Sequence, residues 1–134
     1  MMGRAKVLVI DDNLGFCNIT KMSLEHGGKY QVVTVTNGEM GLVVAKRMRP
    51  DVVLLDIKMP TMDGGEVAAR LLENRLTSSI PIIFLTGLVR KNEVDEAGGY
   101  LSGHPFIAKP FRTEELTRRI EDVLSESELS VEEA

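Results

Sequence analysis

The chain has 134 residues, of which 43% are hydrophobic and 27% are charged, with a net charge of -4. This length suits one domain with a real core and is too short for a second domain of ordinary size. The negative charge and the lack of a strongly basic stretch argue against direct binding of nucleic acid. No apolar stretch approaches the roughly 20 residues of a membrane helix, so we expect a cytoplasmic protein with no membrane partner. The single cysteine, Cys17, excludes an internal disulfide framework and a multi-thiolate zinc site.

Short apolar runs alternate with stretches of helical periodicity from the N-terminus onward. Each run is rich in β-branched residues or continuously apolar, which is typical of strands buried on both faces of a parallel sheet. Strands are predicted over residues 7–10, 30–35, 51–56, 82–85 and 106–108. Helices are predicted from Leu14 to Gly27, around Leu42–Met48, after an N-cap at Asp63, and from Thr113 to Leu124. Between 88 and 103, glycines interrupt the pattern, and only a short or irregular helix is expected.

Along the first helix, Phe16, Ile19, Thr20, Ser23 and Leu24 have the spacing of one buried face. Strands that alternate with helices indicate the α/β class, with a doubly wound, five-stranded parallel sheet and right-handed crossovers. We assign residues 1–124 to this domain and residues 125–134 to an acidic, Ser-rich C-terminal tail.

Polar residues follow the strands where each one ends: Asp11 and Asp12, then Asp56, Thr86 and Lys109. The carboxyl ends of parallel strands meet at one edge of the sheet, where ligands of such folds bind. Taken singly, each residue has a plainer interpretation. Asp12 could cap a helix, Thr86 could be a turn residue, and Lys109 could be a solvated charge. Their common edge favours a shared site.

Three carboxylates at one edge repel each other, by about 4 kcal/mol for a pair 4 Å apart at an effective dielectric constant near 20. Such a cluster needs a cation, and an all-oxygen ligand set favours Mg²⁺. A nucleophilic Asp56 beside the ion, with the Lys109 ammonium and the Thr86 hydroxyl, has the parts that phosphoryl transfer requires.

Four motifs, in this order, resemble the receiver domain of two-component response regulators, including single-domain CheY-like members. They are Val9-Ile10-Asp11-Asp12-Asn13, Leu54-Leu55-Asp56-Ile57-Lys58-Met59-Pro60 with Asp63-Gly64, Leu85-Thr86-Gly87 and Lys109-Pro110-Phe111. The resemblance covers residues 6–124 and implies a flavodoxin-like (βα)5 fold.

The resemblance also implies roles for the site residues. Asp56 would accept a phosphoryl group from the phosphohistidine of a sensor histidine kinase or phosphotransfer protein. Mg²⁺ would be held by Asp12, Asp56 and the backbone carbonyl of Lys58, with Asp11 acting through water. Lys109 would pair with the phosphoryl group, and its peptide bond to Pro110 would be cis. Thr86 would be the switch hydroxyl, and Phe106 the aromatic switch residue.

The sequence departs from the family pattern at several positions. Phe106 lacks the hydroxyl of a tyrosine, so an ordinary core residue is nearly as good an interpretation as a switch residue. The weak helical pattern over 89–103 leaves the family's usual output face and dimer geometry open. Lys58 and Leu88 would flank the phosphate and tune its loss, although a solvated side chain is the plainer interpretation of Lys58. Because Leu88 cannot orient a water molecule, we expect slow autodephosphorylation.

Two other functions compete with the receiver interpretation. Mg²⁺-dependent phosphatases with an aspartyl nucleophile use an Asp two residues after the nucleophile as general acid, but Lys58 stands there. A receiver-like binding module without phosphorylation would not need the intact set of site residues. We therefore expect a signalling domain that catalyses only its own phosphorylation and dephosphorylation. No effector domain follows Leu124, so output through an unidentified protein partner or a phosphorelay is expected, unless the chain is part of a longer protein.

Overall fold

The structure is a computed structural model that describes residues 3–87, 100–101 and 104–133. Its strands form one sheet in the order β2-β1-β3-β4-β6-β5. The strands are β1 (Ala5–Ile10), β2 (Tyr30–Val35), β3 (Val52–Asp56), β4 (Ile82–Thr86), β5 (Tyr100–Leu101) and β6 (His104–Ala108). The helices are α1 (Leu14–Glu25), α2 (Gly38–Met48), α3 (Gly64–Glu73) and α5 (Thr113–Glu133).

The predicted five-stranded parallel sheet is confirmed, with β6 as its fifth strand. The two-residue strand β5 was not predicted, because a pair of residues is too short to show a pattern; it runs antiparallel to β6. The register pairs Asp56 with Leu85 and Thr86 with Ala108. The ends of β3, β4 and β6 therefore reach the same edge of the sheet.

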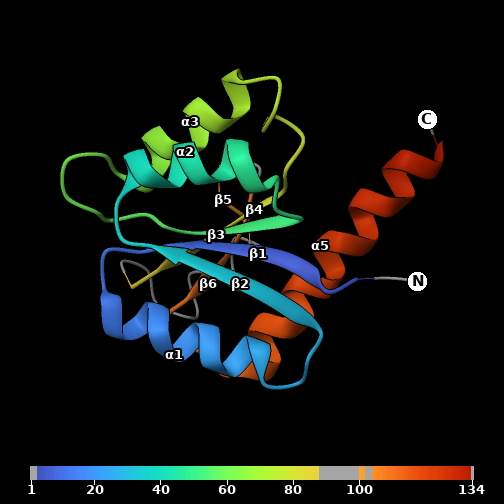
Figure 1. The fold of residues 1–134 in the computed structure, drawn as a ribbon, viewed down its shortest axis with the longest axis horizontal. Coiled ribbons are helices and arrows are strands. Elements are labelled where there is room, and N and C mark those ends of the chain that lie inside the picture. Colours follow the sequence, from blue (N-terminus) through green and yellow to red (C-terminus); the bar gives the residue numbers. More distant parts are fainter. Residues whose placement is uncertain (1–2, 88–99, 102–103, 134) are drawn as a thin grey trace.

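Helices cover both faces of the sheet, with α1 and α5 on one side and α2 and α3 on the other (Figure 1). All five residues of β3 and all five of β4 are buried, which explains why their sequences are apolar without alternation. One core cluster packs toward α1 and α5 around Val9, Leu54 and Ile120. The other packs toward α2 and α3 around Ile10 and Leu71.

The structure describes only part of the connection between β4 and β6, but it describes the backbone of the C-terminal segment to Glu133. The expected irregular helix between 88 and 103 lies outside the described residues, except for strand β5. The segment assigned as an acidic tail is helical as far as Glu133, because α5 continues past Leu124. Ser and Glu carry only small helix penalties, so the composition of this segment does not oppose helix formation.

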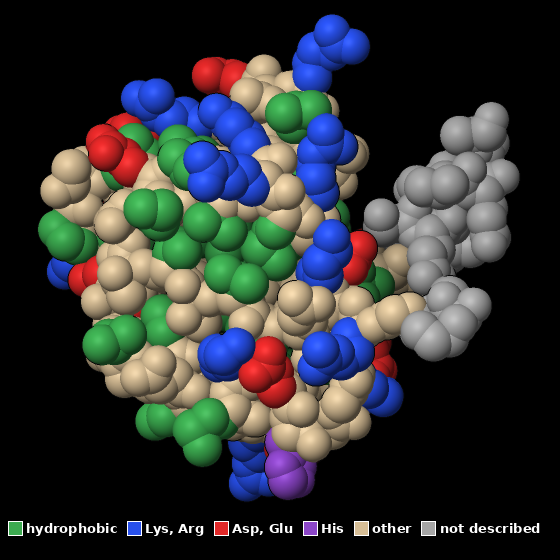
Figure 2. Space-filling view, viewed as in Figure 1, with side chains coloured by type: hydrophobic (Ala, Val, Ile, Leu, Met, Phe, Trp, Pro, Cys, Tyr) green, Lys and Arg blue, Asp and Glu red, His purple; other side chains and the backbone are tan. Residues whose placement is uncertain are grey.

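The described surface is ordinary for a folded domain. Figure 2 shows apolar side chains gathered near the centre of the face that carries α2 and β2, with Lys and Arg side chains around them. Met40 and Val43 of α2 are among the exposed apolar residues. Exposed apolar side chains are common on the surfaces of folded domains. Within the described ranges, none of the helices is long and apolar enough to cross a membrane.

Candidate functional site

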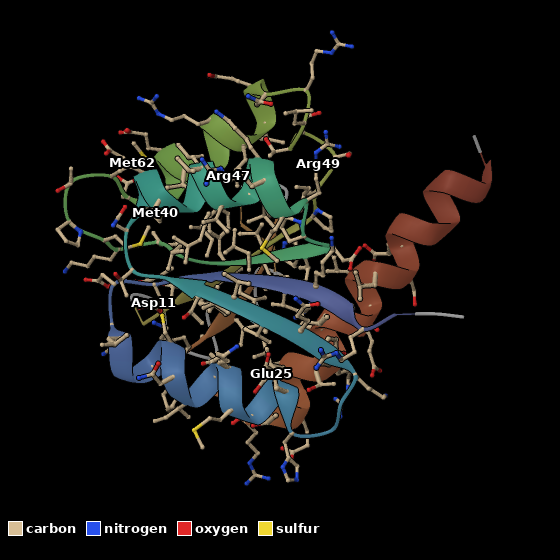
Figure 3. The ribbon with its side chains drawn as sticks, in the orientation of Figure 1. Asp11, Glu25, Met40, Arg47, Arg49 and Met62 are labelled. Atoms are coloured by element: carbon tan, nitrogen blue, oxygen red, sulfur yellow. The ribbon has the colours of Figure 1, made fainter. Side chains whose placement is uncertain are left out.

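The three predicted carboxylates come together at the carboxyl edge of the sheet. One oxygen from each of Asp11, Asp12 and Asp56 lies within 4.8 Å of the other two. Asp11 follows the end of β1, and Figure 3 shows it where the chain turns toward α1. Asp11 and Asp56 are buried, whereas Asp12 is exposed. The cluster thus combines two desolvated carboxylates with one that faces water.

The backbone around Asp11 is fixed by its neighbours. Its N–H donates to the carbonyl of Val35 (3.1 Å), and its Oδ1 accepts the N–H of Asn13 (2.9 Å). Cys17 Sγ donates to the Asp11 carbonyl (3.2 Å). Asn13, not Asp12, is the N-cap of α1, since its side chain accepts the N–H of Phe16. The interpretation of Asp12 as a helix cap is therefore wrong, and its carboxylate belongs to the cluster.

Lys109 brings the counter-charge from the end of β6. Its N–H donates to the carbonyl of Thr86 (2.8 Å), which ties the loop after β6 to the end of β4. Its Nζ lies 2.6 Å from Asp11 Oδ2 and 3.7 Å from Asp56 Oδ1. The side chain is only 23% exposed, so Lys109 is not the solvated charge of the plainer interpretation. The Lys109–Pro110 peptide bond is cis, as predicted.

The electrostatic balance at Asp56 shows that one lysine does not neutralise the cluster. Burial raises the pKa of Asp56 from 3.8 to about 6, and the negative charge of Asp11 adds to the rise. Lys109 and a hydrogen bond from the Lys58 backbone lower this pKa without cancelling the rise. A second cation would stabilise the ionised cluster. Because its donors are carboxylate oxygens, the site fits a hard divalent ion such as Mg²⁺.

The structure also places the other predicted site residues. Thr86 is the last residue of β4 and is buried, so it is a strand residue, not a turn residue. Phe106 is buried in β6, opposite Phe84 of β4. The Lys58 side chain is exposed. Leu88 lies outside the described residues. Whether Phe106 switches, and whether Lys58 and Leu88 tune dephosphorylation, stay predictions.

Two residues near the site were not predicted to belong to it. The ring centroid of Phe16 lies 4.1 Å from Lys109 Nζ, although its spacing in the sequence indicated only a helix face. A side chain at Gly64 would meet the carbonyl oxygen of Asp56 and would approach the Cα of Ile57 to 2.7 Å. Gly64 thus lets α3 pack directly on the chain that carries Asp56, and the Asp63-Gly64 motif was the signal for it.

Comparisons with known proteins agree with this geometry. A family model described as the response regulator receiver domain matches residues 7–121. The chain is 33% identical to the alkaline phosphatase synthesis transcriptional regulatory protein PhoP of Bacillus subtilis, over 93% of this chain and 50% of that protein. It is 34% identical to the protein PilH of Pseudomonas aeruginosa, over 90% of this chain and 98% of that protein.

Solved structures give the same result for the fold. A CheY-like response regulator receiver domain protein from Methanospirillum hungatei superimposes with a TM-score of 0.80 at 27% identity, covering 96% of this chain and 99% of that one. The chemotaxis protein CheY4 of Vibrio cholerae superimposes with a TM-score of 0.77 at 28% identity, covering 90% of this chain and 99% of that one. The chain spans about half the length of PhoP and of several other curated relatives it matches, and nearly the full length of PilH.

Proposed function

Because the chain belongs to the response regulator receiver family of two-component signalling, we propose that Asp56 is its phosphoacceptor. The observation that carries the proposal is the pairing of three carboxylates within 4.8 Å with the Lys109 ammonium at the same sheet edge. Among the three carboxylates, Asp56 stands at the end of the central strand β3, between β1 and β4. On the β4 and β6 side, Thr86 and Lys109 could contact a phosphoryl group on Asp56, and on the β1 side Asp11 and Asp12 could hold a cation beside it.

The proposed reaction is transfer from the phosphohistidine of a sensor kinase or phosphotransfer protein. A carboxylate oxygen of Asp56 forms a bond to phosphorus, the phosphorus–nitrogen bond breaks, and its electron pair returns to the histidine nitrogen. Such transfer depends mainly on positioning and on neutralising charge. Lys109, held at 3.7 Å from Asp56, would contact the phosphoryl oxygens. The Thr86 hydroxyl would bind the group from the end of β4.

We propose Asp11, Asp12, Asp56 and the Lys58 backbone carbonyl as the residues that hold Mg²⁺, with Asp11 acting through water. The raised pKa of Asp56 supports a cation at this position, because burial and, after it, the negative charge of Asp11 make an ionised Asp56 unfavourable without one. When bound, the ion neutralises charge on the transferring phosphoryl group.

The proposed output is a change of surface on phosphorylation. A phosphoryl group adds a charge of about -1.5 to -2, and movement of Thr86 toward it would displace the loop that follows. Phe106 would respond by repacking. The downstream protein partner is unidentified. The relatives include proteins named as transcriptional regulators and the protein PilH.

Slow autodephosphorylation is part of the proposal. Leu88, two residues after Thr86, offers no group that could orient an attacking water, and the Lys58 side chain adds positive charge near the site. Replacing Leu88 by Glu should shorten the phosphoryl half-life, measured by loss of the phosphorylated mass after the donor is removed. An unchanged half-life contradicts a role for this position.

The competing function, an aspartyl phosphatase, predicts a different amount of released phosphate. It needs a general acid two residues after its nucleophile, and this chain has the exposed Lys58 there. Acetyl phosphate with Mg²⁺ should phosphorylate the chain once, and EDTA should prevent it. A simple phosphate ester should release less than one equivalent of phosphate. Release of many equivalents would favour the phosphatase, and failure of acetyl phosphate to react would favour a binding module that is not phosphorylated.

A further inference from the structure

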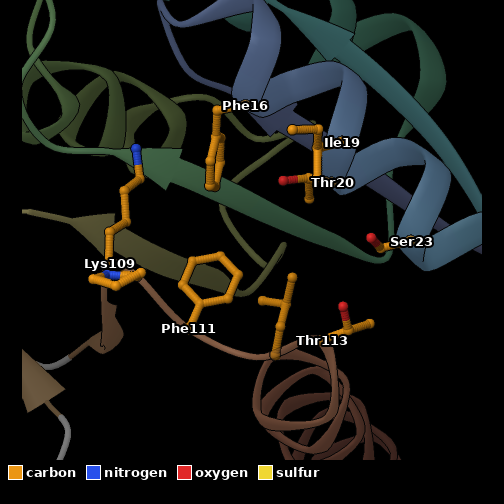
Figure 4. Close-up of a pocket in the computed structure, with 9 residues that line it drawn as sticks. Phe16, Ile19, Thr20, Ser23, Lys109, Phe111 and Thr113 are labelled. Carbon is orange, nitrogen blue, oxygen red and sulfur yellow. The ribbon is translucent and has the colours of Figure 1, made fainter.

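The ammonium of Lys109 has an aromatic partner in addition to its two carboxylates. Its Nζ lies 4.1 Å from the ring centroid of Phe16, 2.6 Å from Asp11 and 3.7 Å from Asp56. Figure 4 shows the Lys109 side chain extending alongside the Phe16 ring. A cation within about 6 Å of a ring centroid is attracted by the negative face of the ring. The ammonium is therefore held both by charge and by the ring.

The Phe16 ring is itself held in place. The backbone N–H of Phe16 donates to the side chain of Asn13, the N-cap of α1, so the first turn of the helix fixes the backbone that carries the ring. Its ring packs edge to face against Phe111, with centroids 5.8 Å apart and an angle of 89° between the rings. Both rings line a cavity of about 400 Å³ between α1 and the start of α5 (Figure 4).

The ring differs from the carboxylates in how it responds to the reaction. A metal ion bound by the carboxylates would compete with Lys109 for Asp11, and phosphorylation would move the negative charge at Asp56 from the carboxylate to the phosphoryl oxygens of an acyl phosphate. The charged partners of the ammonium would therefore change during the reaction, whereas the ring would keep the same uncharged face. Since the Lys109 side chain is 23% exposed and has many rotamers, loss of its partners would let it turn into solvent.

We propose that Phe16 is a positioning residue that keeps the Lys109 ammonium at the phosphoryl site through a cation–π contact buttressed by Phe111. The proposal rests on the proposed function only for its consequence, the rate of phosphorylation. The contact itself is independent of that function. Because the ring already restricts the Lys109 side chain, less conformational entropy is lost when the ammonium contacts the phosphoryl oxygens.

The kinetic test compares side chains with and without a π face. In Phe16→Leu, the apolar volume largely remains and the ring is lost, so phosphorylation by acetyl phosphate and Mg²⁺ should slow by about threefold to tenfold. Phe16→Tyr and Phe16→Trp should restore the wild-type rate to within about twofold. Ile19 is an exposed residue on the wall of the same cavity. The substitution Ile19→Leu is therefore the matched control and should leave the phosphorylation rate unchanged.

A second readout needs neither metal nor phosphate. The ring should shift the ε-methylene protons of Lys109 upfield in the NMR spectrum of the wild type and of Phe16→Tyr, and the shift should vanish in Phe16→Leu. Wild-type ε-methylene protons at ordinary lysine positions would overturn the contact, even if Phe16→Leu did not fold. Two kinetic results would overturn the positioning role of Phe16. One is an equal phosphorylation rate for Phe16→Leu and the wild type, and the other is a slow rate in Phe16→Leu that is equally slow in Phe16→Tyr and Phe16→Trp. If the wild type takes up no phosphate at all, the proposed function fails while the NMR test of the contact still stands.

Discussion

At the scale of single residues, the site holds two buried carboxylates that repel and a lysine that offsets them only in part. The lysine and the predicted carboxylates could be found from the sequence, because each directly follows or ends an apolar run. Phe16 could not, since an aromatic residue at helical spacing indicates packing and gives no sign of which cation it faces. The distance from Lys109 to the ring depends on how α1 sits against the loop after β6.

Replacing Asp56 by Asn should stabilise the fold at neutral pH in the absence of divalent ions. The pKa of Asp56 rises from 3.8 to about 6 on folding, so the folded state binds the proton of Asp56 more tightly than the unfolded state does. This contribution to the free energy of unfolding is fully present below about pH 3.8 and is lost as the pH rises through about 6. Asn carries no charge at any pH. The gain in free energy of unfolding should reach at most about 3 kcal/mol at pH 7.5 and should disappear near pH 4.

Urea unfolding in EDTA at the two pH values measures this difference. Asp122→Asn, which removes an exposed carboxylate from α5, is the control and should give little change at either pH. A stability gain of Asp56→Asn that is the same at both pH values would contradict the repulsion we describe.

At the scale of elements, the strands were predictable, and the buried face of α1 was predictable only in part. The five parallel strands could be predicted because a strand with helices on both faces of its sheet needs a continuous apolar run. For α1 the predicted face included Ile19, but Ile19 is 67% exposed and the core takes Cys17 instead. The observed face keeps Thr20 and Leu24 from the predicted one and adds Cys17. Cys17 bonds the carbonyl of Asp11, a tertiary contact that helical periodicity cannot reveal.

The edge strand β2 is protected by side chains of α1. Glu25 Oε2 accepts the Val32 N–H (3.0 Å), and Lys21 Nζ donates to the Val32 carbonyl (2.6 Å); Figure 3 shows Glu25 on α1 beside β2. The two side chains also pair at 3.1 Å. They occupy backbone groups that an edge strand would otherwise offer to another chain.

Glu25→Ala should therefore lower the free energy of unfolding by about 1 kcal/mol and speed amide exchange at Val32. The hydrogen bond from Val32, followed by Lys21, lowers the pKa of Glu25, so this stabilisation is present above pH 4.5 and is lost as the pH falls through the lowered value. Glu121→Ala, which removes a more exposed pair with Lys29, is the matched control. Unchanged exchange at Val32 in Glu25→Ala would refute the protective contact.

At the scale of the whole molecule, the family match over residues 7–121 and the fold agree on one receiver domain. The order of the strands explains the site, because β3 lies between β1 and β4 and the ends of these strands carry most of its residues. The sequence did not predict that α5 continues to Glu133. Its last turns follow the buried contacts at Leu116, Ile120 and Val123.

A chain that ends at Glu126 should keep the melting temperature and the phosphorylation rate of the full chain, because it retains Leu116, Ile120 and Val123, the residues of α5 that the structure describes as buried. A chain that ends at Arg119 loses Ile120 and Val123 and should be less stable by several kcal/mol. Thermal unfolding followed by circular dichroism measures both. A lowered melting temperature for the chain ending at Glu126 would show that the last turns of α5 support the domain.

The central claim is that Asp56 accepts a phosphoryl group. The most direct test is the intact mass of the wild type and of Asp56→Ala after incubation with acetyl phosphate and Mg²⁺. We predict an increase of one phosphoryl group in the wild type and none in Asp56→Ala, with both chains shown to be folded. An equal increase in both chains, or none in the wild type, would contradict the claim.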